Sequence, residues 1–169
     1  MALLENNKVV ERGKLERDAL HEKGFGELKD KRLVLDLFEA YYLLENDKII
    51  VEDLKGKKVS AEKIAKIACL KDKKWHSKYA VFEDLRQRGY CVKTGFKFGF
   101  DFRVYPKGKK MGEAHSQWCI QALNEGDRHS MTELSRKVRL AQNLKTTLIL
   151  AIVDREDEVN YYQISRTVP

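Results

Sequence analysis

The second half of the chain shows the clearest pattern of hydrophobic and polar positions. Apolar residues recur at helical spacing from Trp75 to about Arg88, and Gly89 follows them. This pattern predicts a helix that ends at a glycine. Beyond the helix, apolar and polar residues alternate, which predicts three strands. They are YCVKT, FGFDFRVY and SQWCIQAL.

The last forty residues predict a helix followed by two strands. Ser130 with Glu133 three residues later forms a capping box, so we expect a helix to about Asn143. The almost wholly apolar TLILAIVD predicts a strand buried on both faces, and VNYYQIS predicts an edge strand. The order helix, three strands, helix, two strands favours a mixed sheet with helices packed against it.

The first half predicts short elements in quick succession. They are a helix that stops at Gly24, a strand at residues 33–35, a helix capped by Asp36 with Glu39, a strand at 49–51 and a helix capped by Ser60. The strongly basic KDKKWHSK then marks a change of composition. We therefore expect an α/β (α+β) protein with a small N-terminal α/β domain at 1–72 and a second domain at 73–169.

Composition excludes several classes of protein. Hydrophobic residues make up 43% of the 169 and charged residues 35%, which is typical of soluble globular proteins. No apolar run approaches the roughly 20 residues of a membrane span, so we expect a cytoplasmic protein without a membrane partner. The three cysteines form no CxxC pair, and neither phosphate-binding glycine motif nor a His or acidic metal cluster occurs. We expect no cofactor and no metal.

The net charge of +7 favours a polyanionic partner. Nucleic acid is the first partner to consider. A surface dense in lysine and glutamate also suits the ion-pair networks of a heat-adapted protein, so charge alone leaves both interpretations open.

Candidate chemistry lies around the loop that follows FGFDFRVY. Tyr105 ends one predicted strand and His115 precedes the next, so the loop can bring both side chains to one edge of the sheet. Histidine exchanges protons near neutral pH, whereas phenol is a poor base unless cations support it. Nearby lysines in the loop are Lys107, Lys109 and Lys110. Taken alone, Tyr105 and His115 form either a reaction centre or the two ends of a solvated basic loop.

Longer stretches resemble a known family. The segment YAVFEDLRQRGYCVKTGFKFGFDFRVY, the following HS, and VRLAQNLKTTLILAIVD are similar to the catalytic domain of the archaeal tRNA-splicing endonucleases. The segment KGFGELKDKRLVLDLFEAYYLLENDKIIV is similar to the N-terminal domain of that family. The resemblance implies a restriction-endonuclease-like mixed sheet in the second domain. It also implies metal-independent cleavage of precursor tRNA at a bulge-helix-bulge, leaving 2′,3′-cyclic phosphate and 5′-hydroxyl ends.

The same resemblance implies roles for individual residues. Tyr105 matches the general base and His115 the general acid. Family members place a catalytic lysine before the last buried strand, where this chain has Thr146, preceded by Lys145. Either Lys145 supplies the positive charge, or the chain is a non-catalytic RNA-binding subunit of a heteromeric enzyme.

Further residues match the RNA contacts and the assembly of the family. Arg139 and Arg166 match arginines that sandwich a flipped base, although both also suit surface ion pairs. The acidic DREDE at 154–158 matches a loop that docks on another subunit, and is otherwise a charged hairpin turn. The resemblance therefore implies a homotetramer, or a heterotetramer with a second subunit.

Overall fold

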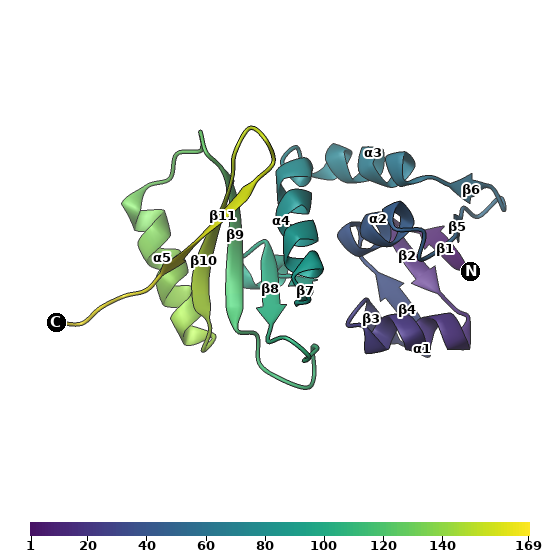
Figure 1. Ribbon diagram of the computed structural model, residues 1–169, viewed down its shortest axis with the longest axis horizontal. Helices are drawn as coiled ribbons and strands as arrows, with labels where there is room; N and C mark the ends of the chain where they lie inside the picture. The colour runs from purple at the N-terminus through teal and green to yellow at the C-terminus, as the bar shows by residue number, and fades with distance from the viewer. The chain divides into compact units, whose positions relative to one another are not determined.

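The computed structural model describes residues 1–169 and divides into two compact units, Met1–Trp75 and His76–Pro169 (Figure 1). Both units combine a mixed β-sheet with α-helices. This confirms the predicted fold class. None of the helices has both the length and the apolar character that a membrane span requires.

The first unit is built on a six-stranded sheet with the order β3-β4-β2-β1-β5-β6. Its strands are β1 Ala2–Glu5, β2 Lys8–Glu11, β3 Glu27–Lys29, β4 Arg32–Leu35, β5 Val51–Glu52 and β6 Lys58–Val59. Only the pairing of β1 with β5 is parallel. The helices of this unit are α1 Lys14–Glu22, α2 Leu37–Glu45 and α3 Ala61–Lys71.

The sequence pattern did not predict the β1–β2 hairpin, and it predicted only one strand, β4, of the β3–β4 hairpin. Asn6 and Asn7 connect β1 to β2, and Asp30 and Lys31 connect β3 to β4. All four turn residues have positive φ, between 47° and 61°. A two-residue turn with both residues left-handed matches the twist of the flanking strands, and asparagine and aspartate tolerate that conformation well. The pattern therefore contained a hairpin signal at Asn6–Asn7.

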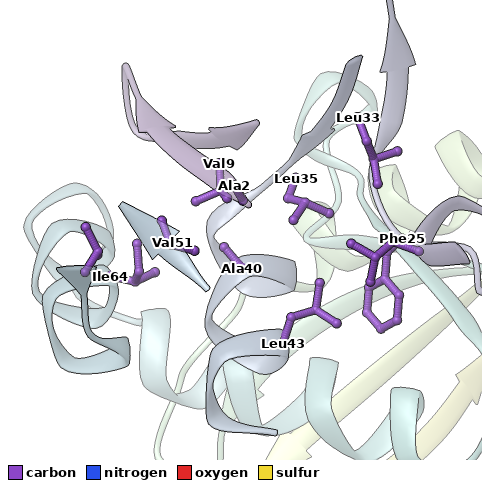
Figure 2. Close-up of a cluster of buried hydrophobic side chains, with 11 residues drawn as sticks. Ala2, Val9, Phe25, Leu33, Leu35, Ala40, Leu43, Val51 and Ile64 are labelled. Atoms are coloured by element: carbon purple, nitrogen blue, oxygen red, sulfur yellow. The ribbon is translucent and has the colours of Figure 1, made fainter. Parts of the chain in front are cut away.

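The hydrophobic core of the first unit lies between its sheet and helices, as Figure 2 shows. Ala40 and Leu43 of α2 pack with side chains of the strands, among them Val9 and Leu35. The predicted capping box of α2 is present, since Asp36 accepts a hydrogen bond from the N–H of Glu39 at 2.9 Å. Glu39 is buried and also accepts a hydrogen bond from the N–H of Gly26 at 2.9 Å, which ties α2 to the segment between α1 and β3.

The second unit contains a five-stranded mixed sheet with the order β11-β10-β9-β8-β7 (Figure 1). Its elements are helix α4 Trp75–Gln87, strands β7 Cys91–Thr94, β8 Phe102–Tyr105 and β9 Trp118–Asn124, helix α5 Met131–Asn143, and strands β10 Thr147–Val153 and β11 Val159–Ile164. A short 3-10 helix, Phe96–Phe98, lies between β7 and β8. The predicted order of helices and strands is confirmed, with β11 at the edge.

The two helices of this unit cover different faces of the sheet. Val138 and Ala141 of α5 pack in one core cluster with Cys119 of β9 and Leu148 of β10. Phe82 of α4 contacts Phe102 of β8, with 5.9 Å between the ring centroids. Because Phe102 stands opposite Ile120, the neighbour of Cys119 in β9, its side chain points to the other face.

A polar contact joins the edge strand β11 to α4. The hydroxyl of Tyr161 donates to Oδ2 of Asp84 at 2.6 Å, and Nε of Arg88 donates to the same oxygen at 2.7 Å. Burial and the hydrogen bond to Asp84 raise the pKa of Tyr161. The neutral phenol is therefore the form that the folded protein favours.

Tyr161→Phe is expected to lower the free energy of unfolding by about 1–2 kcal/mol at pH 7, because the bond to a charged carboxylate is lost. Above pH 10 the unfolded tyrosine loses its proton while the folded one keeps it, so wild-type stability falls with rising pH. The free energy of unfolding then falls by at most about 1.4 kcal/mol per pH unit. The fall is smaller than this limit because Tyr161 is partly exposed, and solvent weakens the effect of its surroundings on the phenol. Urea denaturation of both proteins between pH 7 and 11 measures this, and a constant difference would contradict it.

Candidate functional site

All five strands of the second unit have a terminus at one end of the sheet, which we call the site end. β9 and β10 are parallel, and Trp118 stands opposite Thr147 at the start of both. β8 and β11 run antiparallel to these strands, so their last residues lie at that end. In Figure 1 the β8–β9 loop and the α5–β10 turn both lie at the lower end of the sheet.

Each of the five candidate residues lies in, or a few residues from, an element that begins or ends near the site end. Tyr105 is the last residue of β8, and His115 lies three residues before β9. Lys145 lies two residues before β10, and Arg166 two residues after β11. Arg139 lies four residues before the end of α5. With neighbouring strands about 4.8 Å apart, the ends of β8 and β10 are roughly 10 Å from each other.

The exposure of these side chains differs sharply. Tyr105 is only 1% exposed, whereas His115, Arg139, Lys145 and Arg166 are exposed. A buried phenol has lost the bulk water that stabilises a phenolate, so a nearby cation matters for any role as a base.

Two of the three loop lysines expected beside Tyr105 have other contacts. Nζ of Lys107 lies 5.0 Å from the ring centroid of Tyr90, and Nζ of Lys110 lies 3.6 Å from the carboxylate of Glu113. The cation found against the Tyr105 ring is Arg103, whose Cζ lies 5.6 Å from the ring centroid. Sequence analysis missed Arg103, although alternation along β8 puts residues 103 and 105 on one face.

No group of three His, Cys, Asp or Glu side chains is arranged to hold a metal ion. The buried carboxylate of Asp101 lies before the start of β8, at the other end of that strand from Tyr105. It pairs with Nζ of Lys78 at 2.9 Å and accepts a hydrogen bond from the N–H of Ala122 at 2.8 Å. Asp101 thus joins α4 and β9 to the beginning of β8.

The end of α5 determines how Lys145 and Thr146 are presented. The N–H of Lys145 donates to the carbonyl of Gln142 at 2.9 Å, and the N–H of Thr146 donates to the carbonyl of Ala141 at 3.0 Å. This is the hydrogen-bond pattern of a Schellman motif, and Lys145 occupies its left-handed position with φ 54°. Helix α4 ends with the same pattern, but with Gly89 at that position.

Thr146 lies inside the protein, next to the sheet. Its side chain is 9% exposed and neighbours the thiol of Cys119. Burial raises the pKa of that thiol, while the Thr146 hydroxyl and the positive charge of Arg103 oppose the rise. Because threonine carries no charge, Lys145 is the cation that this turn offers to a ligand.

The fold and the arrangement at the site end define a two-unit α/β protein with a candidate acid–base site. Two family models match the chain. The tRNA intron endonuclease N-terminal domain matches residues 1–65, and the tRNA intron endonuclease catalytic C-terminal domain matches residues 75–161. The chain therefore belongs to the tRNA intron endonuclease family, which confirms the resemblance seen in the sequence.

Curated relatives agree with this assignment. A tRNA-splicing endonuclease of Thermococcus kodakarensis is 41% identical over 140 residues, which span 83% of this chain and 81% of the relative. One of Methanococcus vannielii is 37% identical over 163 residues, or 96% of this chain and 92% of the relative. One of Methanothermobacter thermautotrophicus is 38% identical, with 86% and 84% covered.

The left-handed conformation of Lys145 leads to a stability prediction. Lys145→Gly is expected to be about 1 kcal/mol more stable than Lys145→Ala, because glycine adopts positive φ without the steric cost of a Cβ atom. Urea denaturation of the two variants gives the difference. Both variants remove the same charge, so equal stabilities would contradict the left-handed turn.

Proposed function

We propose that this chain cleaves precursor tRNA in the cytoplasm at both exon–intron junctions. The RNA is a bulge-helix-bulge, and the products carry 2′,3′-cyclic phosphate and 5′-hydroxyl ends. The observation that carries the proposal is the convergence of Tyr105, His115 and Lys145 on one end of the sheet, within the segment that matches the catalytic domain.

The three residues supply the three functions that this transesterification needs. Tyr105 accepts the proton of the ribose 2′-hydroxyl, and the 2′-oxygen attacks the adjacent phosphorus. His115 donates a proton to the 5′-oxygen as its bond to phosphorus breaks. Lys145 stabilises the extra negative charge on the phosphorane. No cofactor takes part in these steps.

Two arginines suit the recognition of an unpaired base. Arg139 and Arg166 are exposed, one on α5 and one just beyond β11. We assign them to a flipped bulge base, because a guanidinium plane stacks on a base while its donors reach phosphate. The net charge of +7 favours the approach of RNA.

We also propose that four subunits assemble, either identical ones or two kinds of chain. The acidic turn at 154–158 is well defined, since Oδ1 of Asp154 accepts hydrogen bonds from the N–H groups of Glu156 and Glu158 at 2.9 and 3.0 Å. This turn exposes Glu156 and Asp157 to solvent, where they are available to dock on another subunit. The outer edge of β11 is a second contact surface of the assembly.

Purified chain is expected to cut a bulge-helix-bulge RNA in the presence of EDTA. Tyr105→Phe, His115→Ala and Lys145→Ala should each lower the single-turnover rate about 100-fold or more, because each removes one of the three functions. Gel analysis of the products identifies the cyclic phosphate. The matched control is His129→Ala, which should cleave normally. His129 is exposed and lies beyond the other end of β9.

Outcomes with variants at 145 and 146 separate this proposal from its rival, a non-catalytic RNA-binding subunit. Wild-type rates for both Lys145→Ala and Lys145→Gly would remove Lys145 from the mechanism. Faster cleavage by Thr146→Lys would show that positive charge is lacking at position 146. Cleavage only after addition of a second, different subunit would favour the rival.

Native mass spectrometry is expected to show a complex of four copies of the 19.7 kDa chain. Glu156→Lys combined with Asp157→Lys should dissociate it into smaller species, because the docking turn then carries the wrong charge. The charge-matched control is Glu22→Lys combined with Glu45→Lys, since both residues are exposed at the ends of α1 and α2. A monomer at micromolar concentration would contradict a homotetramer.

A further inference from the structure

Arg103 occupies an unusual position between two aromatic rings. Its Cζ lies 4.3 Å from the ring centroid of Phe98 and 5.6 Å from that of Tyr105. Phe98 lies in the turn before β8, and Tyr105 is the residue at the end of β8. The guanidinium is therefore held on the same face of the sheet as the phenol of Tyr105.

The contact between Arg103 and Tyr105 bears on whether a buried phenol can accept a proton. Tyr105 is 1% exposed, and burial disfavours the phenolate that a proton acceptor must approach. A positive charge within about 6 Å offsets that cost. Lys107 and Lys110 of the adjacent loop contact Tyr90 and Glu113.

The two strands beside β8 place further titratable groups opposite Tyr105 and Arg103. On β7, Cys91 stands opposite Tyr105 and Lys93 opposite Arg103. On β9, Cys119 stands opposite Arg103. At the site end, His115 and Lys145 are exposed to solvent. Lys93 is thus a further cation that β7 places opposite Arg103.

We propose that Arg103 is a positioning residue that holds Tyr105 in its proton-accepting state, with Phe98 fixing the guanidinium in place. The inference rests on the proposed function for its catalytic consequence. Its physical content, an electrostatic effect of Arg103 on Tyr105, is independent of RNA cleavage.

Single-turnover cleavage provides the first test. Arg103→Met is expected to slow cleavage about tenfold or more while the Kd for the RNA changes less than about twofold, because the cation acts on the base rather than on RNA binding. Arg103→Lys should restore much of the rate. Arg128→Met removes the same charge from an exposed loop beyond the other end of β9 and should cleave like wild type.

The inference also requires that Arg103 affect the cleavage rate by acting on Tyr105. In a Tyr105→Phe background, adding Arg103→Met should cause no further loss, because the group on which Arg103 acts is gone. Equal losses in both backgrounds would overturn the inference, as would an unchanged rate for Arg103→Met in the wild-type background.

A second test requires no cleavage at all. In protein labelled with [13C]tyrosine, the Cζ signal missing from Tyr105→Phe identifies Tyr105, and its pH titration reports phenol ionisation. Arg103→Met should move the midpoint to higher pH by about one unit or more, whereas Arg128→Met should leave it in place. An unmoved midpoint overturns the inference even if the protein cleaves RNA. A moved midpoint in a protein that cleaves nothing upholds it and defeats the proposed function instead.

Discussion

The parallel pairing of β9 with β10 is the constraint on which the site depends. Parallel neighbours need a crossover, and α5 provides it, so both strands begin at the same end of the sheet. An antiparallel β10 would carry Lys145 to the far end, away from Tyr105 and His115. Register matters equally, because a shift of one residue along β8 would turn Tyr105 to the opposite face. The candidate chemistry is thus a consequence of sheet topology.

In the turn from α5 into β10, one residue is exposed to solvent and the next is buried in the core. Lys145 takes the left-handed position and is exposed, while Thr146 is buried beside Cys119. A lysine at position 146 would begin in this buried setting, where an ammonium loses hydration unless a partner or ligand compensates. Threonine avoids that cost, at the expense of a charge next to the sheet. Threonine at position 146 therefore favours local folding, and under the proposed function other side chains must supply the positive charge.

Local signals predicted much of the fold, and non-local contacts account for what was missed. Capping residues such as Ser130 and the alternating strands identified the order of elements in the second unit, because both act over a few residues. The hairpin at Asn6–Asn7 was missed even though its turn chemistry is local. Tyr105 and His115 were candidates from their places at strand ends. Arg103 was not, because its contact with Tyr105 depends on how the side chains pack after the sheet has formed.

Under the proposed function, the site combines a buried base with exposed partners. Tyr105 is fixed within β8 and backed by Arg103, which Phe98 holds in turn. His115 and Lys145 are exposed on a loop and a turn, so their side chains can adjust to RNA at little cost in packing. Under the proposed function, positive charge then reaches the reaction from two directions, with Arg103 behind the base and Lys145 on the solvent side. With threonine at position 146, Lys145 and Arg103 are the two cations on which the proposed reaction depends.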